Sequence, residues 1–485
     1  MSEGSPEFAP LQLKPSGELK PSGELKPSGV AGIRHWIREV LGLDRAVGFT
    51  VLARFWSSAA GLVTVALIAR FLSPAQQGYY YTFGSLVALQ IVFELGFSFV
   101  ILQLASHERA QLAISSEYEI SGTPIAHARL ASVIQKSVRW YSLAAVAMAV
   151  ILLPAGFYFF STHQHPGQSV SWQLPWCSAA LMAALNFQLD PFLSFLEGCG
   201  YVPEVARLRL MQSVTGSLLA WMVLMSHHGL FAPSMMLFGM AFTSLVWLTG
   251  KRKLLLGLLR HQTGIHRIRW NQEVWPFQWR IAVSWLSGYF LFWIFNPVLF
   301  AFRGPVEAGR MGMSLSLANA IQAIAVSWVS TKSAPFGTLI ARKEYRRLDQ
   351  TFFEALRQSF VVSFAGSLVA WLGCIYLNLR HFRFAERLLD PISLGILLIY
   401  MIVNVIVSAE AYYLRAHKQE VFFVNSIVGA VVVTACTLIF GRRYGAPGIV
   451  VSTCLLNAGG LVWATYKFRK YRRLWHTPQE SHVPS

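Results

Sequence analysis

The chain has 485 residues, of which 54% are hydrophobic and 13% charged, and its formal net charge at pH 7 is +18. Soluble domains carry about a quarter charged residues. The shortfall is typical of lipid-facing helices, because a charge at the bilayer centre is costly. The composition excludes an ordinary soluble protein. The basic residues lie mainly in loops, where they can set membrane topology, so nucleic acid is not expected as a partner.

The N-terminal region divides into a tail and a short amphipathic stretch. Residues 1–30 repeat the hexapeptide Lys-Pro-Ser-Gly-Glu-Leu, starting at Lys14, Lys20 and Lys26, with the last copy truncated. A Pro/Gly/Ser-rich repeat cannot bury enough apolar surface to fold, so disorder is predicted. Residues 31–45 carry apolar side chains at helical spacing, which predicts a helix lying in the membrane interface. No apolar run of signal-peptide type precedes them.

Twelve stretches are apolar over the roughly 20 residues that a transmembrane helix needs. They lie near residues 46–70, 79–104, 139–161, 173–196, 210–227, 230–249, 279–302, 310–335, 354–378, 388–410, 421–440 and 446–466. If both termini are cytoplasmic, the inside segments contain 32 Lys and Arg residues and the outside loops 8. This asymmetry follows the positive-inside rule, and a missed span would erode it. The sequence therefore predicts a multi-pass protein with both termini in the cytoplasm.

A motif recurs at a constant offset. The pattern Phe-x-x-Pro-x-x-x-Gly at residues 71–78 returns 231 residues later at residues 302–309, and the dipeptide Ser-Leu at 85–86 returns at 316–317. The two copies follow the first and the seventh predicted span, and an even number of spans between copies gives them the same topology. The predicted domains are six-helix halves at 46–249 and 279–466, a cytoplasmic linker at 250–278 and a basic cytoplasmic tail at 467–485.

The first two spans also carry a family resemblance. A helix that closes in Ala69-Arg70-Phe71-Leu72-Ser73-Pro74 is followed by Gly78-Tyr79, and the second helix contains Glu94-Leu95-Gly96. This arrangement resembles the N-terminal signature of the multidrug/oligosaccharidyl-lipid/polysaccharide (MOP) exporters, and most of all their Wzx-type polysaccharide flippases. Residues 191–198, 413–416 and 444–448 resemble later parts of the same proteins, so the resemblance covers roughly residues 45–470.

The resemblance implies an all-α polytopic membrane protein of the MATE-like MOP fold in a bacterial inner membrane. It implies a transporter rather than an enzyme, with no cofactor. The substrate would be a lipid-linked saccharide on a polyprenyl pyrophosphate, used for polysaccharide such as O-antigen or lipopolysaccharide. Membrane lipid, a polysaccharide polymerase and glycosyltransferases would be the partners.

Ionisable residues at membrane depth are the candidate site, because such residues usually face a bundle interior or a water-filled cavity. Arg54 lies about two turns inside the first span; it could hold a phosphate bidentately or snorkel to the headgroups. Glu94 lies mid-helix. It could pair with a cavity arginine or serve as a proton-coupling site, and the alternative is a purely structural ion pair with Arg54. Asp190 precedes Pro191, which suggests a kink; it could line the pore or satisfy the broken helix.

The remaining candidates lie in the second half. Arg280 opens the seventh span, where snorkelling competes with a substrate role. Trp293 and Asn296 continue an aromatic and polar stripe that starts at Trp285 and would either contact sugar rings or form a packing seam. Lys332 and Glu410 are expected to mark the membrane interface. The cysteines are scattered and have no metal or disulfide spacing.

The leading hypothesis is a flippase that moves the lipid-linked saccharide between leaflets by rocking of the two halves. A cation-coupled multidrug antiporter of the MATE type is the alternative, although residues 46–70 lack the acidic residue which that family resemblance would require. A lipid II flippase would have about fourteen spans by the same resemblance. A scaffold or polymerase subunit would show a large outside loop.

Overall fold

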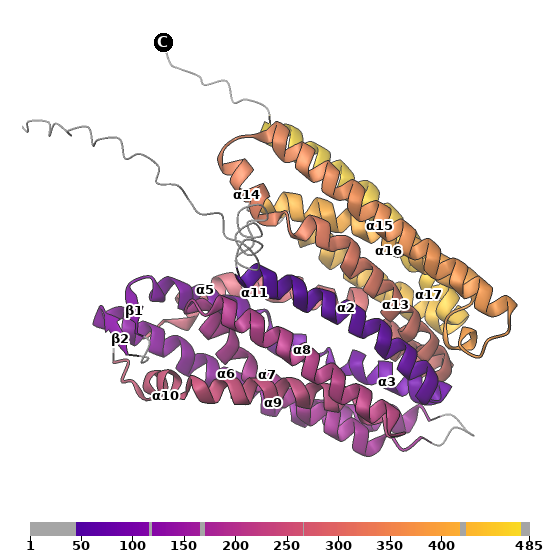
Figure 1. Cartoon of the computed structure of the whole chain (residues 1–485), viewed down its shortest axis with the longest axis horizontal. Helices are drawn as coiled ribbons and strands as arrows, with labels where there is room; N and C mark the ends of the chain where they lie inside the picture. The colour runs from indigo at the N-terminus through magenta and orange to yellow at the C-terminus, as the bar shows by residue number, and fades with distance from the viewer. Residues whose placement is uncertain (1–44, 116–118, 165–169, 265, 418–422, 477–485) are drawn as a thin grey trace, which may run out of the picture. The chain divides into compact units, whose positions relative to one another are not determined.

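The computed structural model of the chain describes residues 45–115, 119–164, 170–264, 266–417 and 423–476. The predicted tail at 1–30 lies outside the described residues, and so does the predicted interfacial helix at 31–45 except for Arg45. The described chain is almost entirely helical (Figure 1).

The first half comprises helices α2 to α10 and one small hairpin. Its helices are α2 (Arg45–Phe71), α3 (Pro74–Val87), α4 (Gln90–Glu94), α5 (Phe97–Arg109), α6 (Pro124–Thr162), α7 (Gln173–Gly198), α8 (Val202–Met225), the single turn η1 (Gly229–Phe231), α9 (Ala232–Gly250) and α10 (Arg252–Arg260). Strands β1 (Leu112–Ile114) and β2 (Ile120–Gly122) pair antiparallel between α5 and α6.

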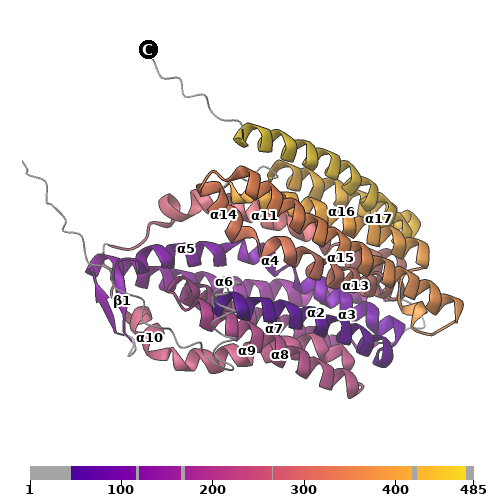
Figure 2. The same ribbon diagram turned by 45° about the horizontal axis from the view of Figure 1, so that its top comes forward.

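The second half comprises everything from the π-helical turn η2 to α17. Its elements are η2 (Trp270–Val274), α11 (Trp275–Phe292), α12 (Phe295–Arg303), α13 (Pro305–Ser330), α14 (Ser333–Ala341), α15 (Tyr345–Leu379), η3 (Ala385–Arg387), α16 (Pro391–Ala416) and α17 (Phe423–His476). Helices α13, α15, α16 and α17 pack on one another, and Figure 2 shows α17 lying along α16.

The described residues contain ten helices that are long and apolar enough to cross a membrane, or eleven if the bent pair α3–α5 counts as one. Helix α17 holds both of the last two predicted spans, one on each side of Gly445, where the backbone leaves the helical region (φ 69°, ψ −147°). Each predicted span overlaps described helix, so the all-α polytopic fold class is confirmed, and the chain is a multi-pass membrane protein.

Two predicted spans are broken, which the hydropathy pattern did not indicate. In the second, Leu95 and Gly96 adopt left-handed conformations (φ 52° and 68°) between α4 and α5, and the helix axis bends by 43°. In the seventh, the helix is interrupted between α11 and α12, at Trp293 and Ile294. Both breaks lie inside apolar sequence, so a scan for apolar length cannot find them.

The two copies of the repeated motif are both helix starts. Ser73 caps α3 by accepting a hydrogen bond from the Gln76 amide, the Gln76 side chain caps Ser73 in return, and Pro74 takes the first helical position. Pro305 takes the same position in α13, after Gly304. Proline suits that position because its ring fixes φ and the missing N–H would be unpaired anyway. The motif therefore has the same structural role in both halves.

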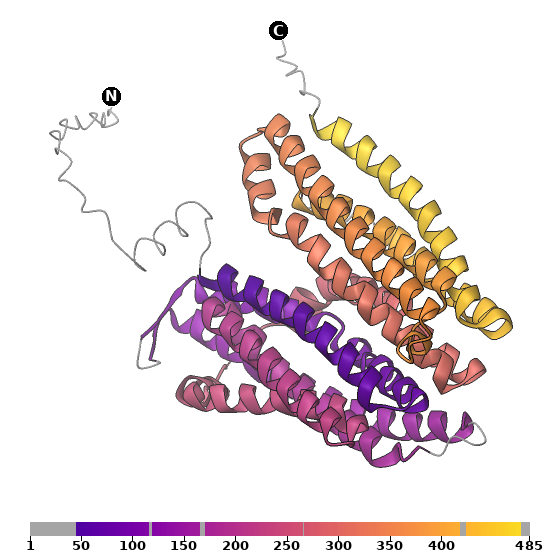
Figure 3. The same cartoon turned by 45° about the vertical axis from the view of Figure 1, so that its right-hand side comes forward.

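The two helices that these motifs begin pack directly against each other. A Cβ on Gly78 would lie 1.8 Å from the carbonyl oxygen of Pro305, and a Cβ on Gly309 would lie 2.9 Å from the amide nitrogen of Gly78. Only glycine permits this approach of two backbones. The contact of α3 with α13 joins the halves at the ends where both helices start (Figure 3).

Candidate functional site

The contact between α3 and α13 is reinforced by a buried glutamine. The Gln77 side chain is 1% exposed, and its Nε2 donates to the carbonyl oxygens of Gly309 at 2.8 Å and Arg387 at 3.0 Å. The Arg387 guanidinium donates back to Gln77 Oε1 at 3.4 Å. Both polar atoms of the Gln77 side-chain amide are thus hydrogen-bonded to the second half. Because buried polar groups are costly to leave unpaired, these bonds make the junction specific.

A second junction lies at the opposite end of α13. Arg54 Nη1 on α2 donates a hydrogen bond to Ser330 Oγ at 2.7 Å. Gly309 and Ser330 are about 32 Å apart along a helix that rises 1.5 Å per residue. Backbones of the two halves meet at the first junction, and at the second an Arg54 side-chain bond joins α2 to α13. The halves also touch where α12 packs on α3 and where α11 packs on α4 and α5.

Arg54 has an exposed side chain and forms no ion pair with any described residue. The predicted alternative of an ion pair with Glu94 is therefore wrong. A guanidinium has five donors and a permanent charge, and one neutral hydroxyl uses only a small part of that capacity. The arrangement leaves an uncompensated cation between α2 and α13.

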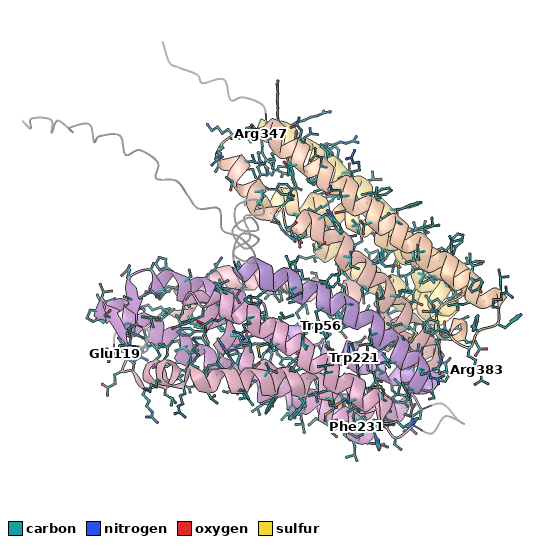
Figure 4. The ribbon with its side chains drawn as sticks, viewed as in Figure 1. Trp56, Glu119, Trp221, Phe231, Arg347 and Arg383 are labelled. Atoms are coloured by element: carbon teal, nitrogen blue, oxygen red, sulfur yellow. The ribbon has the colours of Figure 1, made fainter. Side chains whose placement is uncertain are left out.

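Helix α2 is attached to the first half through aromatic side chains. The Trp56 ring nitrogen donates to Ser217 Oγ at 3.1 Å, and the Trp221 ring nitrogen donates to Thr64 Oγ1 at 2.8 Å. The two indole rings lie 6.2 Å apart between α2 and α8 (Figure 4). Close to Arg54, the hydroxyls of Ser57 and Ser213 are hydrogen-bonded at 3.0 Å. Hydroxyl groups and indoles therefore line the attachment of the helix that carries Arg54.

Glu94 belongs to a hydrogen-bond chain within the first half. Ser98 Oγ donates to Glu94 Oε1 at 2.7 Å and bonds the hydroxyl of Tyr141, which is fully buried, at 2.9 Å. Glu94 ends α4, directly before the left-handed residues that break the second span. The helix break thus presents this carboxylate beside α6.

Asp190 lies near the same chain. It is half-buried in α7, which continues through Pro191, and it interacts electrostatically with Glu94 and with Arg209. Arg209 is itself bonded to Glu197 at 2.7 Å. The structure therefore gathers two predicted candidates, Glu94 and Asp190, in one region, and it places Arg54 in a different one.

The candidates on the seventh span do not share one face. Asn296 is buried in α12 and donates to Ser85 Oγ at 3.2 Å, and its Oδ1 has no partner among the described residues. Trp293 is 47% exposed at the interruption between α11 and α12. Arg280 lies in α11, but its side chain lies outside the described ones.

Glu410 lies inside the second half. Its side chain is buried in α16 and accepts a hydrogen bond from Thr465 Oγ1 of α17 at 2.8 Å, and its position at the membrane interface stays a prediction. Its Oε2 has no partner among the described residues. Lys332 is exposed where α13 gives way to α14, and its position at the membrane interface stays a prediction. Sequence spacing missed Glu410 because its burial depends on α17 running alongside.

The segment that joins the halves is clamped onto α6. Arg129 donates to Glu108 Oε1 at 2.8 Å and to Glu273 Oε2 at 2.6 Å. Ser132 Oγ accepts from the Ile268 amide at 2.9 Å, and the Lys136 ammonium donates to the Ile268 carbonyl. Burial raises the pKa of Glu273. Hydrogen bonds from Arg129 and from the Arg269 amide lower it by more than burial raises it, so the pKa lies below its usual value.

No protein-family model matches the chain, and no curated protein sequence matches it. Several solved structures share its fold, among them three transporters. The lipid II flippase MurJ in an inward closed conformation has a TM-score of 0.52 at 15% identity and covers 87% of each chain. The MATE multidrug transporter DinF-BH has a TM-score of 0.55 at 13% identity, over 89% of this chain and 96% of that one.

The third is a multidrug resistance MATE family transporter of the MOP superfamily in an outward-facing conformation. Its TM-score is 0.52 at 14% identity, over 90% of this chain and 98% of the other. These likenesses extend over nearly the whole length of both chains. The chain has the fold of the MOP superfamily.

Proposed function

We propose that this protein is a flippase that moves a lipid-linked oligosaccharide, carried on a polyprenyl pyrophosphate, across the bacterial inner membrane for polysaccharide biosynthesis. The observation that carries the proposal is Arg54, an exposed arginine inside the first span with no carboxylate partner among the described residues. An unpaired guanidinium between the halves suits the anionic linkage of such a substrate, because arginine binds phosphate oxygens bidentately.

The two junctions support an alternating-access route. With both termini in the cytoplasm, the Gln77 junction closes the outer end, and the Arg54 bond to Ser330 lies towards the cytoplasm. A substrate phosphate would enter beside Arg54 and take it from Ser330, since an anionic phosphate offers an opposite charge and two acceptor oxygens to the guanidinium, whereas the serine hydroxyl is neutral and accepts one bond. Opening of the outer end would then require Gln77 and Gly309 to separate. MurJ, a lipid flippase, shares the fold.

A cation-coupled multidrug antiporter of the MATE type is the second candidate function. The hydrogen-bonded Glu94 and the neighbouring Asp190 favour it, because two acidic groups of one region could bind a coupling ion. Residues 46–70 contain no Asp or Glu, which weighs against it. Under the flippase proposal, the same carboxylates would couple transport to an ion gradient.

The test is the substitution Arg54→Ala in cells that make the polysaccharide. A lost charge-assisted contact costs about 1.5–3 kcal/mol, roughly ten- to a hundredfold in affinity. Export should stall and lipid-linked glycan should accumulate in the inner leaflet at normal protein abundance. Arg54→Lys should restore export in part, because lysine keeps the charge without the fork.

Ser330→Ala is the matched control, since it removes the hydrogen bond but keeps the cation. We expect Ser330→Ala to export normally. If it stalls export as strongly as Arg54→Ala does, the bond itself is what matters and Arg54 does not read the substrate. Two results together would support the antiporter instead. The protein would extrude cationic dyes and lose this activity in Glu94→Gln, and Arg54→Ala would have no effect on glycan export.

A further inference from the structure

The second half carries a group of cations at the start of α15 and at the end of α17. These residues, which we call the basic cluster, lie on the turn before α15, on the first turns of α15 and on the last turns of α17: Arg342, Lys343, Arg346, Arg347, Arg357, Lys467, Arg469, Lys470 and Arg473. Eight of the nine are exposed, and Lys467 is half-buried above the Trp463 ring.

Ion pairs involve only some of the cations in each half. In the first half, Arg129, Arg209 and Lys251 each bond a glutamate at 2.6–2.8 Å. In the basic cluster, Arg347 pairs with Glu344 and Arg469 interacts electrostatically with the buried Glu410, whereas Arg346 and Lys470 form no ion pair with a described acidic residue. The cluster therefore carries a net positive charge that the described part of the protein does not neutralise.

The cluster is held on a rigid base. Asp349 of α15 accepts hydrogen bonds from Arg472 of α17 at 3.0 and 2.7 Å and from the Tyr413 hydroxyl of α16 at 2.9 Å. Beneath these bonds lies a buried apolar core that includes Phe352 and Phe468. The ends of α15, α16 and α17 are thus fixed to one another.

The outer faces of both helices change character along their length. On α17 the exposed face reads Val462 and Tyr466, then Arg469, Lys470 and Arg473, at helical spacing. This sequence of residues passes from apolar to basic within one turn. Such a change on a lipid-facing surface marks the boundary between the hydrocarbon and the headgroups.

Helix α15 shows the same change in the reverse direction. Its exposed face begins with Arg346 and Arg347, carries Phe353, Glu354 and Arg357 in the next turns, and is apolar from Phe360 to Phe364. The helix has 35 residues, or about 52 Å, and the hydrocarbon is about 30 Å thick, so its first turns lie beyond the hydrocarbon. Figure 4 labels Arg347 in its first turn and Arg383 in the loop that follows its end.

We propose that the basic cluster is a binding site for the headgroups of anionic phospholipids. The cations stand at headgroup depth beside an apolar, lipid-facing surface, so a phospholipid can place its chains on Tyr466 and Phe360 and its phosphate among Arg346, Arg469 and Lys470. Each cation near an anionic membrane surface contributes about 1 kcal/mol. Three together correspond to roughly a hundredfold in affinity. The site is independent of the proposed transport function.

The experiment titrates the full-length protein in detergent with phosphatidylglycerol or phosphatidylcholine and counts bound lipids by native mass spectrometry. We expect the wild type to prefer phosphatidylglycerol. The variant Arg346→Gln/Arg469→Gln/Lys470→Gln should lose roughly a hundredfold of that preference. The matched control, Arg380→Gln/Arg383→Gln/Arg442→Gln, removes three exposed arginines from the opposite end of the same half and should keep it.

Three results would overturn the proposal. The wild type could bind both lipids equally. The control could lose as much as the cluster variant, so that net charge alone explains the preference. Inorganic phosphate at millimolar concentration could displace the lipid completely, so that the site takes free phosphate. Melting temperatures of both variants in phosphatidylcholine report folding separately, and a cluster variant that melts as the wild type does has lost binding rather than structure.

Discussion

Gln77 of α3 and Gly309 of α13 are joined by a hydrogen bond of 2.8 Å, although 232 positions separate them in the sequence. They belong to the two copies of one motif, since Gly309 is the counterpart of Gly78. The repeat thus supplies both surfaces of the contact that closes the halves at this end. One copy of the motif in each half therefore forms one side of the contact.

Gly78→Ala should weaken that closure. Its Cβ would lie 1.8 Å from the Pro305 carbonyl oxygen, which cannot move without its helix. Overpacking costs about 1–3 kcal/mol, which shifts an equilibrium between closed and open ends roughly 5- to 150-fold. Spin labels at His228 and Arg383 in a cysteine-free background should report a longer distance.

Gly84→Ala is the control on the same helix, because nothing lies within 4 Å of its added Cβ. It should leave the distance unchanged. Equal distances in wild type and Gly78→Ala would show that α3 and α13 do not hold this end closed.

The clamp on α6 predicts a pH dependence. Because the folded-state pKa of Glu273 lies below its usual value of 4.5, the carboxylate contributes stability above that value and loses it as pH falls through the folded pKa. Pepsin should therefore cut the segment 261–274 increasingly below about pH 4.5 in the wild type. Glu273→Gln cannot titrate at this position. Its cleavage rate, divided by the activity of pepsin on an unfolded substrate at the same pH, should not change with pH.

Removal of Arg129 should be more damaging than neutralisation of Glu273. Arg129→Ala leaves Glu108, whose side chain is 5% exposed, without its arginine, and breaking a buried pair costs on the order of 3 kcal/mol. The yield of folded protein should fall. Glu108→Gln/Arg129→Gln removes both charges and should recover much of that yield; failure to recover would mean that the pair itself, not the orphaned charge, holds the segment.

Gly445 should tolerate no side chain. Its φ of 69° and ψ of −147° are nearly confined to glycine, and an added Cβ would meet Glu307 Oε1 at 2.1 Å. That oxygen accepts the Ala446 amide at 2.6 Å and so begins the second part of α17. Gly445→Ala should lower the melting temperature by several degrees, whereas Gly459→Ala, with open space around its Cβ, should not. Equal melting would refute the role of the turn.

Topology remains a prediction with a direct test. A reporter active only in the cytoplasm should work when fused after Arg473 or His261, and one active only outside should work after Thr162. Activity of the outside reporter at His261 would overturn the arrangement of spans and the assignment of the Gln77 junction to the outer face.

The helices and the repeat could be predicted because their signals are local. Apolar length marks each span, and proline and glycine mark the helix starts at Pro74 and Pro305. The break at Leu95 could not be predicted, since a left-handed leucine has no compositional signature. The partner of Arg54 was equally hidden: Ser330 is 276 residues away, and nothing near either residue encodes the pairing. Such contacts depend on how distant helices meet.

The clamp of the connecting segment onto α6 has a consequence for how the chain is assembled. Ile268 and Val274 are buried, and Ser132, Lys136 and Arg129 hold the backbone and Glu273 of this segment in place. Covalent continuity between Arg260 and Arg267 therefore adds little to what these side chains already do. Two polypeptides, divided in that interval and synthesised separately in one cell, should find each other in the membrane and rebuild the whole protein.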